Sequence, residues 1–128
     1  MKINNRLILW MIGIIIGIGT VYYACIGVKK IARRYKAINV VKQELVSFDF
    51  DPSSYSYNVY KFDGDMDKFP LPMTERVQGS DLILGKTNLW VVYIHPPKGT
   101  KGLYPVGGQR WFVVDIDSNQ ILVRYGTR

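Results

Sequence analysis

The chain has 128 residues, of which 48% are hydrophobic and 21% are charged, a length that fits one small domain with an added segment. Its formal net charge of +7 resides in the first 36 residues, which carry seven Lys and Arg and no acidic residue, whereas the remainder carries ten basic and ten acidic residues. This neutral remainder argues against a nucleic-acid-binding domain, and the single cysteine excludes a disulfide framework.

The first predicted element is a transmembrane helix. Twenty-two residues, Leu7 to Val28, follow one another without a charged side chain. At about 1.5 Å per residue such a helix spans roughly 33 Å, enough to cross a hydrocarbon core of about 30 Å. Trp10 near one end, and Tyr22 and Tyr23 near the other, are aromatic residues of the kind that settle at membrane interfaces. We predict that residues 1–28 form an uncleaved, single-pass anchor.

Two other interpretations of this segment stay open. Lys2 and Arg6, followed by the apolar residues 7–16, fit the first two regions of a cleaved signal peptide. Cys25, preceded by Ala24, fits a lipidated cysteine. The anchor is favoured over cleavage because the residues left at a mature amino terminus would still be apolar.

The charges beside the span bear on its orientation. Five basic residues follow it, against Lys2, Arg6 and the amino terminus before it, and this count favours a cytoplasmic domain. A short tail with three positive charges is itself hard to export, so the opposite orientation stays open. Cations in such positions also attract anionic lipid. The five are Lys29, Lys30, Arg33, Arg34 and Lys36.

Gly13 and Gly17 have the small-xxx-small spacing that lets two membrane helices approach closely. The spacing is consistent both with a homodimer through the span and with ordinary lipid-facing glycines.

Residues 29–51 are predicted to form an amphipathic helix that leads into the domain and stops before Pro52. Apolar residues recur there at steps of three and four, and we expect this stripe to cover one face of a sheet. The stripe consists of Ile31, Tyr35, Ile38, Val41, Leu45 and Phe48.

Residues 52–128 are predicted to form an antiparallel sheet of four or more strands. The expected strands, rich in β-branched and aromatic residues, are residues 55–60, 88–95, 110–117 and 120–125. A short polar connection joins the last two and fits a tight hairpin. The fold class is therefore α+β, with a transmembrane helix that runs into the amphipathic helix and the sheet.

The sequence offers little chemistry. Its one histidine, His95, ends a predicted strand, and its one cysteine, Cys25, lies in the span, so neither a nucleophilic dyad nor a zinc site can be assembled. We predict that His95 is a structural residue, that the protein is not an enzyme, and that it binds no metal or cofactor.

The carboxy-terminal block has a distinctive order of short motifs. W-V-V at residues 90–92 precedes a loop ending in G-G at 107–108, an apolar strand at 111–117 ending in I-D, I-L at 121–122 and Y-G at 125–126. This order resembles bacterial immunity proteins of the nuclear-transport-factor-2-like (cystatin-related) fold. Tyr93 stands where that family has a glycine after W-V-V, and only one amphipathic helix precedes the sheet, so the resemblance implies a shortened, cystatin-like version.

The resemblance implies a function. Such proteins bind and neutralise a cognate toxin delivered by type VI or contact-dependent secretion. A binder fixed at a membrane meets an incoming toxin at raised local concentration, which favours a bacterial inner-membrane anchor with a periplasmic domain. An anchored scaffold subunit of a secretion or conjugation apparatus is the alternative.

A Pro- and Gly-rich loop between the second and third predicted strands is the first place to expect contacts with a toxin, because tyrosine and arginine are frequent interface anchors. Trp90 and Trp111 are expected in the core instead. The candidate contact residues are Lys98, Lys101, Tyr104 and Arg110.

Overall fold

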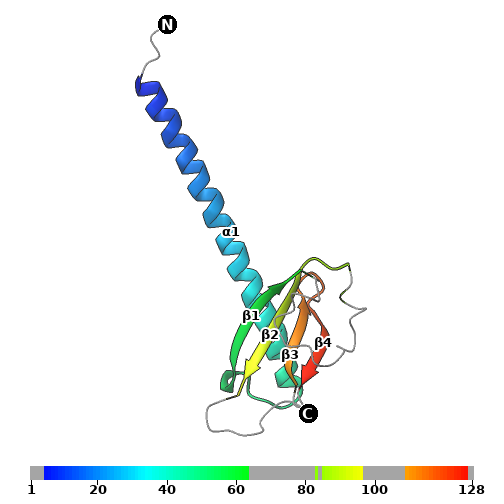
Figure 1. Ribbon diagram of the computed structural model, residues 1–128. Coiled ribbons are helices and arrows are strands. Elements are labelled where there is room, and N and C mark those ends of the chain that lie inside the picture. The colour runs from blue at the N-terminus through cyan, green and yellow to red at the C-terminus, as the bar shows by residue number, and fades with distance from the viewer. Residues whose placement is uncertain (1–4, 64–82, 84, 97–108, 127–128) are drawn as a thin grey trace. The chain divides into compact units, whose positions relative to one another are not determined.

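The computed structural model describes residues 5–63, 83, 85–96 and 109–126, with only the backbone of Gln109 and Arg110. The chain divides into two compact units, residues 1–33 and 34–128. The described residues form one long helix, a short 3₁₀ helix and four strands (Figure 1). In chain order they are α1 (Asn5–Ser47), η1 (Pro52–Ser54), β1 (Ser56–Phe62), β2 (Leu89–His95), β3 (Gln109–Asp115) and β4 (Gln120–Gly126).

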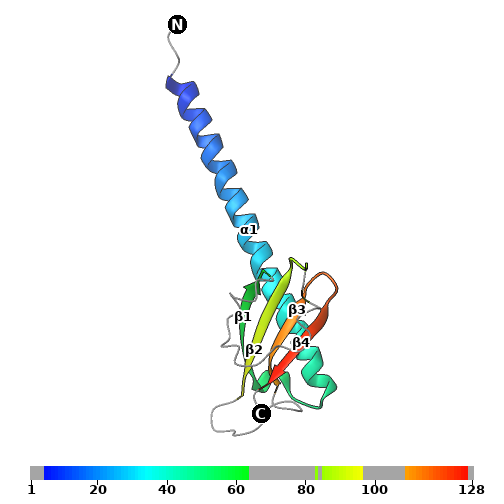
Figure 2. The same ribbon diagram turned by 45° about the vertical axis from the view of Figure 1, so that its right-hand side comes forward.

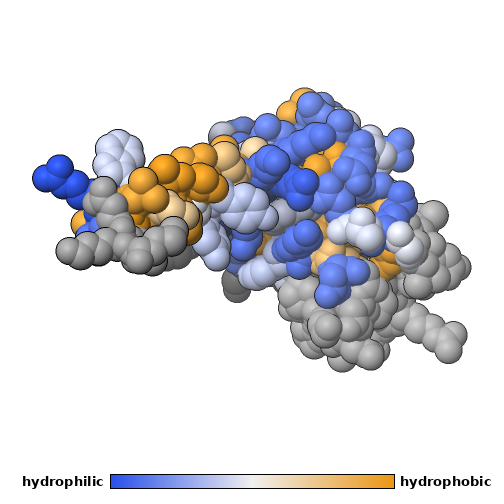
Figure 3. All heavy atoms as spheres, turned by 90° about the horizontal axis from the view of Figure 1, so that it is seen from above, coloured by the Kyte–Doolittle hydropathy of each residue, from blue (hydrophilic) through white to orange (hydrophobic). Residues whose placement is uncertain are grey.

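The first unit contains the apolar part of α1. Its large side chains are exposed, for example Leu9 at 68% and Ile18 at 66%. Thr20 does not interrupt the apolar surface, because its hydroxyl donates to the carbonyl oxygens of Ile16 and Gly17, each at 2.9 Å. Figure 3 shows hydrophobic atoms concentrated on this helix, while the other described surface in that view is largely hydrophilic. One helix long and apolar enough to cross a membrane is therefore present near the amino terminus.

The second unit contains an open antiparallel sheet with the strand order β1-β2-β3-β4 (Figures 1 and 2). The predicted α+β class and the four predicted strands are confirmed, each strand starting or ending within two residues of the expected position. The hairpin between β3 and β4 is closed by the pair Asp115 and Gln120. Asn119, in its loop, has a φ of 55°, a left-handed conformation that asparagine tolerates well.

One face of the sheet belongs to a buried cluster that includes the carboxy-terminal turns of α1. Ala37, Val41 and Leu45 recur every four residues along the helix and are completely buried. Alternate residues of the two central strands complete the cluster, since successive side chains of a strand point to opposite faces. These strand residues are Trp90, Val92, Ile94, Phe112 and Val114.

The predicted apolar stripe of the amphipathic helix is wrong in part. Val41 and Leu45 lie in the cluster, but Ile31, Tyr35 and Phe48 are 56%, 63% and 39% exposed. The buried face begins at Ala37, a residue too small to dominate a hydrophobicity pattern. Side-chain size in the stripe therefore does not identify the face of the helix that packs against the sheet.

The opposite face of the sheet carries a second buried cluster, so the central strands are apolar on both sides. Leu89 to Val92 of β2 are all buried for this reason. Trp111 and Leu122 are partly buried against this cluster. Its buried members are Phe62, Ile83, Leu89, Val91, Val113 and Val123.

A Schellman motif ends α1. The N–H of Phe50 donates to the carbonyl of Leu45 and the N–H of Asp49 donates to that of Val46, both at 3.0 Å. Asp49 adopts a φ of 63°, at the position where glycine is usual. The helix thus ends at Ser47, earlier than Pro52 alone would require.

Replacing Asp49 with glycine is expected to stabilise the second unit by about 1 kcal/mol, because glycine adopts the left-handed conformation without steric cost. Urea denaturation of the full chain in detergent micelles measures the change. Ser47→Gly is the matched control: Ser47 is the last helical residue, so glycine there should destabilise. Two effects of the same sign would contradict the assignment.

A compact turn connects α1 to the sheet. Asp51 caps η1 by accepting hydrogen bonds from the backbone N–H of Ser53 at 2.9 Å and from its hydroxyl at 2.7 Å. These hydrogen bonds from Ser53 hold the pKa of Asp51 below its usual value. The hydroxyl of Tyr57 donates to the carbonyl of Pro52 at 2.6 Å, and burial raises the pKa of Tyr57 to about 12. The turn thereby fixes the start of β1.

Candidate functional site

Most of the predicted contact residues lie outside the described part of the chain. Lys98, Lys101 and Tyr104 belong to residues 97–108, which are not described, and Arg110 lies in β3, where only its backbone is described. Their role in binding stays a prediction.

The predicted helix-pairing residues lie on one face of α1. Gly13 and Gly17 are four residues apart, and a Cβ atom at either would meet no other atom within 4 Å. Thr20, Ala24 and Gly27 continue the same stripe at steps of three and four. The stripe is open, and its small side chains leave room for a second helix to approach.

A row of aromatic side chains crosses the sheet on the face opposite the helix. Asn58 of β1 pairs with Tyr93 of β2, Tyr93 pairs with Trp111 of β3, and Trp111 pairs with Tyr125 of β4. Residues paired in this way point to the same face, and neighbouring strands lie about 4.8 Å apart, so the four side chains extend over about 14 Å. We name these four residues, with the adjacent His95, the aromatic row.

Four members of the row, Asn58, Tyr93, His95 and Trp111, contact one another. The ring centroids of Tyr93 and Trp111 are 4.0 Å apart, and the rings are tilted by 36°. The ring of His95 meets that of Tyr93 edge-on, with centroids 4.1 Å apart. Nδ2 of Asn58 lies 3.0 Å from Nε2 of His95, which places the imidazole proton on Nδ1 if the amide donates. These four side chains thus form one contiguous group on the sheet.

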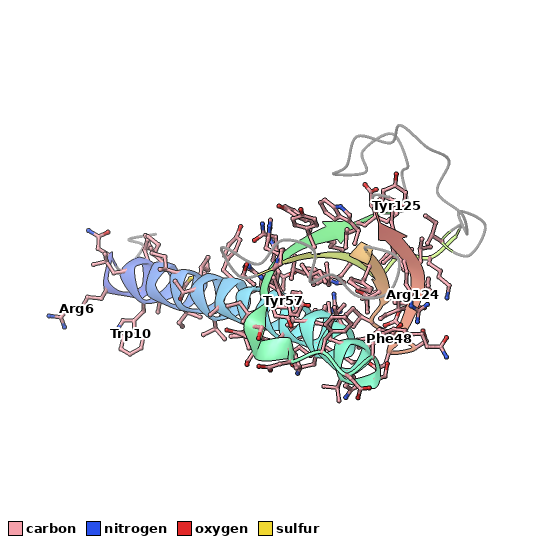
Figure 4. The ribbon with its side chains drawn as sticks, turned by 90° about the horizontal axis from the view of Figure 1, so that it is seen from below. Arg6, Trp10, Phe48, Tyr57, Arg124 and Tyr125 are labelled. Carbon is pink, nitrogen blue, oxygen red and sulfur yellow. The ribbon has the colours of Figure 1, made fainter. Side chains whose placement is uncertain are left out.

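The row is partly exposed and its side chains carry no formal charge when His95 is neutral. Asn58 is exposed, whereas the two tyrosines, Trp111 and His95 are half-buried. Figure 4 shows Tyr125 and its neighbour Arg124 directed to opposite sides of the sheet. Arg124 forms an ion pair with Glu44 of α1, so it belongs to the helix side. Tyr125 belongs to the other side.

Sequence reasoning located some members of the row but did not connect them. His95 ends β2 as expected, and Trp90 is in the core at 3% exposure. Trp111 was expected in the core but is only partly buried. The alternation of Tyr93 and His95 within one strand was a usable signal that both share a face. The partners in β1 and β4 could not be read from that alternation.

Among the described residues, the charged groups at the β3–β4 hairpin are engaged in structural contacts. Nζ of Lys86 lies 2.7 Å from Oδ2 of Asp115, and the backbone N–H of Asp117 donates to Oδ1 at 3.0 Å. The hydrogen bond from Lys86 is the main reason that the pKa of Asp115 lies below its usual value. Nδ2 of Asn88 donates to Asp117 at 2.8 Å. These contacts secure the β3–β4 hairpin.

The geometry of the row suits binding. The side-chain amide of Asn58 is the polar partner of the His95 ring. In the described ranges, neither a nucleophile nor a carboxylate contacts His95. The described residues contain no group of three or more His, Cys, Asp or Glu that could hold a metal ion. Tyrosine and tryptophan, by contrast, are the side chains that most often carry binding energy in protein interfaces.

The chain was compared with protein-family models, with curated proteins and with solved structures. None of the three comparisons finds a match.

Proposed function

We propose that the protein is a membrane-anchored immunity protein that binds and neutralises one cognate secreted bacterial toxin of the type VI or contact-dependent class. The aromatic row is the observation that carries this proposal, because it offers partly exposed Tyr and Trp side chains, and the described residues around them form no catalytic arrangement. The helix of membrane-spanning length and the resemblance of the carboxy-terminal motifs give further support.

The second unit is proposed to be a shortened, cystatin-like module in which an amphipathic helix covers the sheet. The buried cluster shared by Ala37, Val41 and Leu45 with the strands supports this fold, as does the consecutive antiparallel strand order. Lys98, Lys101 and Tyr104 lie in sequence between His95 and Trp111, two members of the row. The proposed loop contacts are therefore adjacent in sequence to two members of the row.

Neutralisation itself is tested in cells. Deletion of the gene should be harmful only when the gene of a neighbouring secreted toxin is present, and co-expression should restore growth. A string of apparatus genes beside it, with loss of secretion on deletion, would instead favour the scaffold.

The binding surface is tested with a pair of substitutions in the row. Asn58→Ala with Tyr125→Ser should weaken toxin binding at least about fivefold, because truncation of an interface anchor costs more than about 1 kcal/mol. Lys61→Ala is the matched control, since Lys61 is exposed on β1 but pairs with Trp90 on the helix side. Titration calorimetry measures both affinities. Equal loss in test and control, or no loss in the test, would reject this surface.

The loop contacts need a separate experiment. Charge reversal at Lys98 and Lys101 should lower the affinity for the toxin if the loop contributes. Unchanged affinity would remove the loop from the proposed interface and leave the row as the contact surface.

The domain is proposed to face the periplasm from the bacterial inner membrane. Alkaline phosphatase fused after Arg128 should then be active, because that enzyme needs the disulfides that form outside the cytosol. A green fluorescent protein fused at the same position should stay dark if exported unfolded. The reverse pattern would place the domain in the cytosol, as the flanking charges alone favour.

The scaffold alternative rests on a different observation, the open stripe of small residues that begins with Gly13 and Gly17. It predicts a homodimer through the span. Gly17→Leu should abolish cross-linking between copies in membranes, whereas Gly19→Leu, which lies off the stripe, should leave it unchanged. Self-association that survives Gly17→Leu would reject pairing through this face.

A further inference from the structure

Three exposed cations lie on α1 directly after the apolar run. Lys29, Lys30 and Arg33 belong to the first unit and to the same unbroken helix as residues 7–28. Lys29 and Arg33 are four residues apart and share one side of the helix, while Lys30 lies about 100° around the axis. No acidic residue occurs in the sequence before Glu44.

The sequence of the helix supplies no counter-charge next to these cations. Like charges four residues apart on a helix repel each other and destabilise it. The sequence places no carboxylate within one or two helical turns of these cations. The helix therefore offers Lys29 and Arg33 no partner of its own, and an anion bound there would stabilise them in this conformation.

On the same side of α1, the residues that precede Lys29 and Arg33 are apolar. Tyr22 and Ile26 precede Lys29 and Arg33 at steps of three and four, and their side chains are 64% and 47% exposed. One side of the helix thus presents cations next to apolar side chains, and an elongated molecule with an anionic head and a hydrocarbon tail could contact both. An arginine guanidinium can grip a phosphate with two hydrogen bonds, and lysine adds a point charge.

We propose that Lys29, Lys30 and Arg33 bind the phosphate headgroups of anionic phospholipids, with the acyl chains lying along Ile26 and Tyr22. The inference rests on the proposed membrane span and adds a lipid preference to it. It concerns residues of the first unit, whereas the aromatic row belongs to the second.

The test uses the full chain in phosphatidylcholine vesicles that contain either spin-labelled phosphatidylglycerol or spin-labelled phosphatidylcholine. Electron spin resonance reports how much of each label is immobilised beside the protein. The natural chain should immobilise phosphatidylglycerol preferentially, and K29Q/R33Q should lower that preference about fivefold or more, the factor that corresponds to the attraction of one such cation to an anionic surface. Raised sodium chloride should also weaken it.

The control is K61Q/R128Q, which removes the same charge elsewhere in the chain and should leave the preference unchanged. A preference that is absent in the natural chain, or lost equally in both variants, would overturn the proposal. So would displacement of the lipid by inorganic phosphate beyond the effect of sodium chloride at equal ionic strength, because the site would then take a free anion. A separate flotation experiment with neutral vesicles tests the membrane span itself. If the protein does not float with these vesicles, both the span and this inference are overturned.

Discussion

Phe112→Ala is expected to destabilise the second unit by about 3–5 kcal/mol, the range for removal of a buried aromatic ring. Phe112 is completely buried in the cluster between the sheet and the helix, and it lies in β3, a central strand. Its neighbours across the strands are Val92 and Arg124, so a cavity there is bounded by backbone that is hydrogen-bonded on both sides. The surrounding structure can relax little into this cavity, so the loss of stability should lie toward the upper end of the range.

The measurement is urea denaturation of the full chain in detergent micelles, followed by tryptophan emission. Phe48→Ala is the matched control, because Phe48 follows the last residue of α1 (Figure 4). Phe48 is 39% exposed. The substitution should cost less than about 1 kcal/mol. Similar losses for the two substitutions would show that the cluster does not stabilise the unit as described.

Lys86→Met is expected to destabilise the second unit by about 1–3 kcal/mol at neutral pH, because it removes the amine that pairs with the carboxylate of Asp115. Asp115 is only 5% exposed, so water could replace that partner poorly. Asp115 keeps its hydrogen bond from the N–H of Asp117, which limits the loss. Lys61→Met, at an exposed position on β1, is the control and should change stability little.

The pH dependence of this pair has a definite sign. The pKa of Asp115 lies below its usual value in the folded chain, mainly because Lys86 donates to it. The pair therefore contributes stability above the usual carboxyl pKa of about 3.9, and that contribution is lost as the pH falls through the lower, folded value. The natural chain and Lys86→Met should differ most at neutral pH and converge in strong acid. A difference that stays constant from neutral pH to strong acid would contradict the pairing.

The sequence predicted the elements whose signals are local. An uncharged run of twenty-two residues indicated the long apolar helix, and β-branched and aromatic runs indicated the four strands. The inward face of α1 was harder to predict, because it depends on what packs against the helix. Ala37 is buried there while Tyr35 is exposed, the reverse of what side-chain hydrophobicity suggests.

The aromatic row could not be predicted because it depends on register between distant strands. Asn58 and His95 are 37 residues apart in sequence, yet their side chains meet. A shift of one residue in the β1–β2 register would send Asn58 to the helix side and bring Tyr57 or Val59 to the row. Alternation within a strand shows which residues share a face, but it does not show which residues stand beside them.

The close contact between Tyr93 and Trp111 has a spectroscopic consequence. Two aromatic chromophores 4.0 Å apart at a fixed tilt should couple their electronic transitions, which gives a circular dichroism band that neither ring produces alone. Any molecule that settles on these rings or turns one against the other would alter that band. The chain thus carries an intrinsic, label-free optical signal of occupancy at this position.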